Sequence, residues 1–91
     1  MKLIMGKLTG STVSNYWKLD DEVIEKFNLN YEEYFSNLIG QYAIVENMND
    51  YSLVKIIGIA ETTEENEVFI MGKKINKKVT NILGTKCVIG G

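Results

Sequence analysis

Three apolar runs in the middle of the chain, separated by two polar segments, constrain the fold more than any other feature of the sequence. The runs span residues 42–45, 53–59 and 68–71 and are rich in Val, Ile, Tyr and Phe. Clusters of Asn, Asp, Thr and Glu lie between them. Short runs of this composition, bounded by turn-forming residues, are typical of strands joined by hairpins. We therefore expect mostly antiparallel strands at the centre of the fold.

A first strand is predicted over residues 2–8, ahead of this central region. Its apolar residues fall on both faces, as do those of the run 53–59, which is typical of interior strands. Gly6 interrupts the first of these strands and predicts a bulge or a close approach of two backbones, and Gly58 predicts a bulge or a kink in the second. The segment 9–15 has the Gly, Ser, Thr and Asn content of a loop.

Two short helices are predicted between the first strand and the central runs. The first spans 21–27, with Asp20 or Asp21 as the N-cap. The second begins after Asn30 and ends before Gly40, a residue suited to the turn that follows a helix. Its apolar side chains recur with the helical period of 3.6 residues and predict one buried side, made of Tyr31, Tyr34, Phe35, Leu38 and Ile39.

The segment 74–83 supports two interpretations. Ile75, Val79, Ile82 and Leu83 have helical spacing, which favours a short helix ending at Gly84. The many β-branched residues and the lysines at the start of the segment favour a strand instead. We expect a helix here, followed by a last strand over 85–89.

These elements predict a single α+β domain over residues 1–91. Its form would be a small, mostly antiparallel five-stranded sheet or an SH3-like barrel. A two-helix insertion would follow strand 1, and a short helix would precede the last strand. The alternative is an open five-stranded sheet with helices on one face.

The composition argues against an enzyme, because the chain has no His and no Arg and all ten basic residues are Lys. His is the commonest acid–base group near neutral pH and a frequent metal ligand. No known catalytic or nucleotide-binding motif is present. Cys87 is the single cysteine, so neither an internal disulfide nor a cysteine zinc site can form within one chain. We expect no catalytic residues, no cofactor and no bound metal.

The chain shows neither a signal peptide nor an apolar stretch of the roughly 18 residues that a membrane span requires. We therefore expect a soluble, cytoplasmic protein. Charge is unevenly distributed, because all twelve acidic residues lie between Asp20 and Glu67. With five lysines against these twelve, residues 1–67 carry a net charge of −7, whereas residues 68–91 carry five lysines and no acid.

Two surfaces are candidates for binding. The first combines acidic and aromatic side chains and would present negative charge to a protein whose basic groove normally holds nucleic acid; it comprises Tyr16, Trp17, Asp20, Asp21, Glu22, Glu25, Tyr31 and Glu32. A solvated helix surface and a core Trp are the plainer interpretation of the same residues. The second is a basic patch that would contact phosphates, formed by Lys73, Lys74, Lys77 and Lys78.

Small, acidic domains without catalytic motifs, such as this one, are similar to phage or mobile-element proteins that bind and block a host enzyme. The resemblance implies a non-enzymatic, anti-CRISPR-like inhibitor whose partner is a host nuclease or defence complex. The alternative is a small β-barrel that binds nucleic acid through the Lys patch. A third hypothesis is a self-associating structural subunit, or a small-molecule binder at the interface of a homo-oligomer.

Overall fold

The computed structural model describes residues 1–47, 50–63, 69–70 and 73–84, with only the backbone described at 47, 69–70 and 73–78. Two short helices accompany a mixed sheet, which confirms the predicted α+β class. In chain order the elements are β1 (Lys2–Leu8), β2 (Ser14–Leu19), α1 (Asp21–Lys26), α2 (Glu32–Ser36), β3 (Tyr42–Asn47), β4 (Asp50–Glu61), β5 (Phe69–Ile70) and β6 (Lys73–Gly84).

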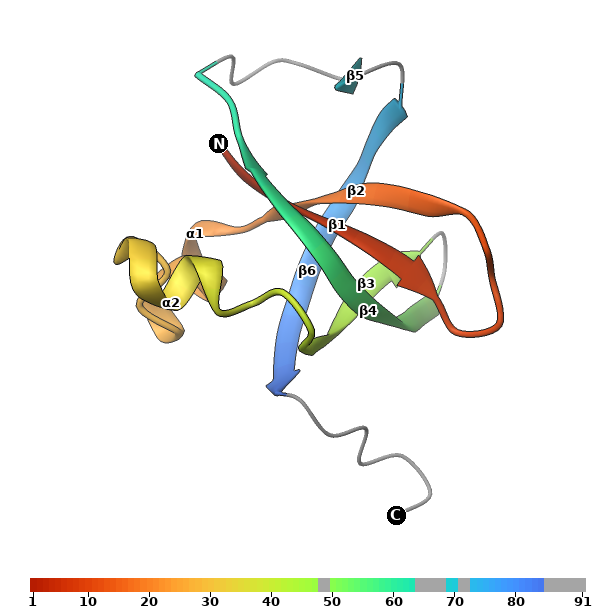
Figure 1. Ribbon diagram of the computed structural model, residues 1–91, viewed down its shortest axis with the longest axis horizontal. Helices are drawn as coiled ribbons and strands as arrows, with labels where there is room; N and C mark the ends of the chain where they lie inside the picture. Colours follow the sequence, from red (N-terminus) through yellow and green to blue (C-terminus); the bar gives the residue numbers. More distant parts are fainter. Residues whose placement is uncertain (48–49, 64–68, 71–72, 85–91) are drawn as a thin grey trace.

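The strands are ordered β2-β1-β4-β3-β6-β5, and β2 also pairs with β6. Each of the five longer strands therefore has a partner on both sides, and their pairings run in a ring. The β2–β6 pair is parallel and the other pairs are antiparallel, so the sheet is mostly antiparallel as expected. Figure 1 shows β6 passing behind β1 and β2, which brings the last described strand beside the first hairpin.

Two predicted elements are wrong. The loop expected over 9–15 ends at β2, so the two helices follow the second strand and not the first. The segment 74–83 is part of β6 and not a helix, because its backbone pairs with both β2 and β3. Local spacing allowed a helix, but the β-branched residues of this segment suit the strand that these neighbours select. The strand predicted over 85–89 lies outside the described residues.

The prediction of a bulge at Gly6 and Gly58 is confirmed. Met5 is opposite Gly58 in β4, but Gly6 is opposite Ile56, so Ile57 is an extra residue in β4. A Cβ atom at Gly6 would lie 3.1 Å from Cβ of Val54. The two backbones approach closely at this point, and β1 is interior as predicted, with Leu3 and Ile4 fully buried.

Alternate residues of the ring of strands form one hydrophobic core. Trp17 and Leu19 of β2 lie in it with Val54, Ile56 and Val79 of β4 and β6. The helices contribute Val23 and Phe35 to this core, and the turns that follow them contribute Leu29 and Leu38. In Figure 1 the two helices lie together on the side of the strands away from the β1–β2 turn.

The two helices differ in how well the sequence predicted them. α1 starts after Asp20 as expected, although the Asp20 side chain makes no capping hydrogen bond. α2 has only five residues, and Gly40 adopts a left-handed φ of 93° in the turn beyond it. Of the apolar stripe predicted for this helix, Phe35 and Leu38 are buried but Tyr31, Tyr34 and Ile39 are exposed.

Candidate functional site

Two of the predicted binding residues belong to the core. Tyr16 and Trp17 are only 4% and 3% exposed, and they pair with Met5 and Ile4 of β1. Because consecutive side chains of a strand point to opposite faces of the sheet, β2 is covered on both faces at this point. The prediction of an exposed aromatic at these positions is corrected: their side chains stabilise the fold and do not form a binding surface.

The acidic residues predicted for the site are at the surface of the helical segment, by which we mean residues 20–39. Asp21, Glu22, Glu25 and Glu32 are exposed, and Asp20 is half-buried. Glu33 is exposed beside them, and Lys26 is the one basic residue of the segment, so its net charge is −5. Within the described part of the chain, none of the five exposed carboxylates forms an ion pair. Their charge is therefore available to a partner.

An aromatic pair lies within this acidic surface. Tyr31 is 65% exposed and Tyr34 is 51% exposed, and their rings meet edge to face with centroids 5.9 Å apart. The helical period had assigned both residues to the buried side, but Tyr31 was also named for the binding surface, whereas Tyr34 was missed. The sequence carries no signal for this, because the helix is shorter than its periodicity predicts: it ends at Ser36, and the buried side chains are Phe35 within it and Leu38 beyond its end.

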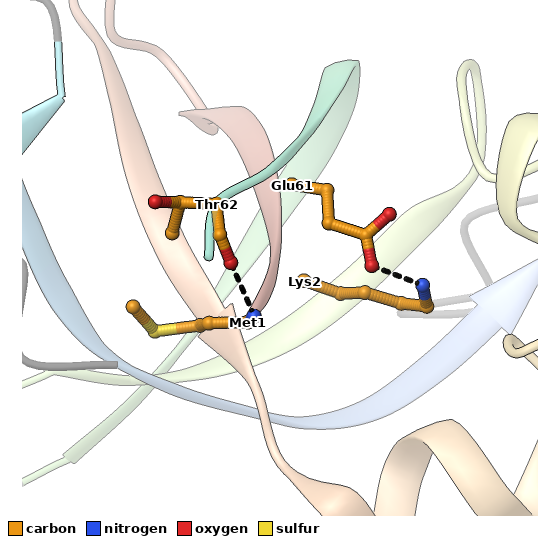
Figure 2. Close-up of polar contacts among 4 residues, drawn as sticks. All are labelled: Met1, Lys2, Glu61 and Thr62. Carbon is orange, nitrogen blue, oxygen red and sulfur yellow. Dashed lines mark hydrogen bonds and ion pairs between the residues drawn. The ribbon is translucent and has the colours of Figure 1, made fainter. Parts of the chain in front are cut away.

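Next to the helical segment, the side chain of Lys2 joins β1 to β4. Its Nζ atom lies 2.6 Å from Oε2 of Glu61, and this hydrogen bond and charge hold the pKa of Glu61 below its ordinary value. Nζ also lies 4.9 Å from the centroid of the Phe35 ring, within the range of a cation–π contact. Figure 2 shows the Lys2–Glu61 pair beside the hydrogen bond from the Met1 amino group to the Thr62 carbonyl oxygen.

A pocket of about 400 Å³ opens where α2 meets the ends of β1 and β4. We call it the Lys2 pocket. Its charged side chains are Lys2, Glu32 and Glu61, and its apolar ones are Leu29, Phe35 and Ile59. Asn30 and Ser36 complete the lining with uncharged polar groups. It is the point at which the acidic surface of the helical segment reaches the sheet.

The structure places the lysines of the alternative site along the backbone of β6. Lys78 is opposite Lys18 of β2, and Lys73 and Lys74 are opposite β5. The helical stripe that would have gathered Lys73, Lys74, Lys77 and Lys78 is absent because this backbone is extended. Their side chains lie outside the described residues.

Within the described residues, no charged or polar side chain is buried and no group of three acidic or Cys side chains is arranged to hold a metal ion. No helix in the described part of the chain is long and apolar enough to cross a membrane. No protein-family model matches the chain, and neither does any curated protein or solved structure. The surface of the helical segment is therefore the candidate site, argued from its own geometry.

Proposed function

We propose that the chain is a non-enzymatic binding protein that holds a basic surface of another protein against its helical segment. The observation that carries the proposal is the exposed Tyr31–Tyr34 pair on a segment whose five exposed carboxylates form no ion pair with a described residue. Tyrosine is enriched among the residues that contribute most to protein interfaces, and it loses few rotamers on binding. Because the two rings already contact each other, less ordering is needed when a partner covers them.

The charge of the helical segment favours one kind of partner. Six carboxylates against one lysine attract a basic surface and repel an acidic one such as a nucleic acid. Basic surfaces of this extent are typical of proteins that bind DNA or RNA. By occupying such a groove, the chain would inhibit a nucleic-acid enzyme, and a phage or mobile element would use it in this way against a host nuclease or defence complex.

The experiment is a lysate pull-down with the tagged chain and matched variants. We expect one dominant partner, retained by wild type and lost when Tyr31→Ala and Tyr34→Ala are combined. Loss of two such aromatic contacts should weaken binding at least about 30-fold. Asp21→Lys with Glu25→Lys should also release the partner, and excess heparin should displace it from wild type because heparin competes for basic surfaces.

Tyr51→Ala is the matched control, because Tyr51 is 64% exposed but lies on β4, outside the helical segment. It should leave the partner bound. A partner set unchanged by the Tyr31/Tyr34 and charge-reversal variants would contradict the proposal. The purified partner should then lose nucleic-acid binding when the chain is added. If the chain itself shifts DNA or RNA at low salt, the alternative of direct nucleic-acid binding replaces this one.

A further inference from the structure

The Lys2 pocket already holds an ammonium group of the protein itself. The Lys2 side chain is only 15% exposed, and its Nζ atom lies between a carboxylate oxygen of Glu61 at 2.6 Å and the ring of Phe35 at 4.9 Å. A carboxylate and an aromatic ring facing one cation are the groups with which proteins recognise ammonium and guanidinium. The chemistry of this pocket therefore suits a cation.

Lys2 does not balance the charge of the pocket. Two carboxylates, Glu32 and Glu61, line it together with one ammonium. Glu32 is exposed and has no ion-pair partner among the described residues. The volume of about 400 Å³ lies at the small end of the ~300–1,000 Å³ range of ligand pockets, so Lys2 leaves room for a second group.

We propose that the Lys2 pocket receives one Lys or Arg side chain of the partner, with Glu32 as its counter-ion. The inference rests on the proposed function, because the basic side chain would come from the surface that covers Tyr31 and Tyr34. Glu32 pairs with the charged end of the incoming side chain, and the apolar residues Leu29 and Ile59 contact its aliphatic part. Glu61 stays paired with Lys2.

The test is a titration with a single basic side chain, followed by NMR of the labelled, full-length protein. The probe is N-acetyl-arginine methylamide, and the neutral control is the citrulline analogue, which has nearly the same shape without the charge. We expect saturable shifts at the amides of Glu32, Phe35, Ile59 and Glu61 with the arginine probe alone. Binding of one exposed cation should be weak, with a dissociation constant of order millimolar.

Variants assign the contribution of each group. Glu32→Gln should weaken binding of the probe by roughly two- to fivefold, the range of a solvent-exposed ion pair. Lys2→Met keeps the aliphatic part of the side chain and leaves two carboxylates without an internal cation, so it should strengthen binding by a similar factor. The double Tyr31→Ala, Tyr34→Ala variant should bind the probe like wild type, because neither ring lines the pocket.

The result that overturns the inference is an arginine probe that gives no localised shifts, or shifts that citrulline matches or that Glu32→Gln and Lys2→Met leave unchanged. This failure is distinct from failure of the proposed function. If the probe does not bind but the partner is still lost with Tyr31→Ala and Tyr34→Ala, only the inference about the pocket is overturned. If the probe binds but no partner depends on Tyr31 and Tyr34, the pocket is a cation site and the proposed function is contradicted.

Discussion

At Gly6 the backbone of β1 lies against the side chain of Val54. A methyl group there would be 3.1 Å from Cβ of Val54 and 3.3 Å from the carbonyl oxygen of Lys55. Because Val54 is fully buried, it has little room to move. We expect Gly6→Ala to lower the free energy of unfolding by about 1–3 kcal/mol, as overpacking does. Urea denaturation of the two proteins measures the difference.

Gly58 supplies the matched control for this substitution. It lies in the same bulge, but a Cβ there would be an ordinary 3.5 Å from Cβ of Met5. Gly58→Ala should therefore leave stability unchanged or raise it by up to about 1 kcal/mol, because alanine restricts the unfolded chain. Equal losses at the two positions would show that the close approach at Gly6 is not the cause.

The Lys2–Glu61 pair makes stability depend on pH. The Lys2 ammonium lowers the pKa of Glu61 in the folded protein, so the pair stabilises the fold above the unfolded pKa of Glu61 and ceases to do so as pH falls through the lower, folded value. We expect Glu61→Gln to reduce the urea midpoint near neutral pH and to match wild type at strongly acidic pH. Glu33→Gln is the control, at an exposed carboxylate that forms no ion pair with a described residue, and it should not reproduce this pattern. A Glu61→Gln effect that is the same at all pH values would contradict the assignment.

At the scale of the element, β6 is the clearest case in which pairing overrides local spacing. Val79 is fully buried between Leu19 of β2 and Val45 of β3. Val79→Ala should therefore destabilise the protein by about 2 kcal/mol through lost burial and the cavity left behind. Val13→Ala is the matched control: Val13 is exposed in the β1–β2 turn, and the change there should be within about 0.5 kcal/mol. Equal effects of the two substitutions on urea denaturation would contradict the burial of Val79 in a strand between β2 and β3.

The sequence predicted those elements whose local pattern and final environment agree. β1, β3, β4 and α1 were found because their apolar residues are buried where the pattern placed them. β2 was missed because Ser14 and Asn15 resemble a loop, and only the pairing with β1 and β6 makes them a strand. Pairing between residues far apart in the chain leaves no local signal in the sequence. The helix predicted over 74–83 was wrong for this reason, because the segment pairs with β2 and β3.

The charge of the candidate site and one of its aromatic residues, Tyr31, were predicted, but Tyr34 was not. A run of acidic residues at helix starts is visible in the sequence, and the exposed carboxylates of the helical segment lie where it indicated. Burial of an aromatic residue depends on its neighbours in space. Trp17 belongs to the core, which was the plainer interpretation of its position, whereas Tyr34 is exposed although the helical period placed it on the buried side.

At the scale of the whole molecule, the fluorescence of Trp17 is sensitive to the pairing of β2 with both of its neighbouring strands. This residue is the single Trp, lies in the core and belongs to the strand that pairs with β1 and β6. We expect unfolding curves from Trp17 fluorescence and from far-UV circular dichroism to coincide, as they do in a two-state transition. Fluorescence that changes at lower urea than the dichroism would show that β2 detaches before the remaining strands unfold.

The pairing of β2 with β6 has a consequence for synthesis on the ribosome. When residues up to Glu61 have left the exit tunnel, β2 lacks the strand against which one side of it packs, and β3 lacks the same strand. The apolar side chains that form the core, Trp17 and Val45 among them, then have no cover on that side. Contacts between distant parts of a chain form late and slowly. This side of the core therefore stays exposed on the nascent chain until β6 has left the tunnel and can pair with β2 and β3.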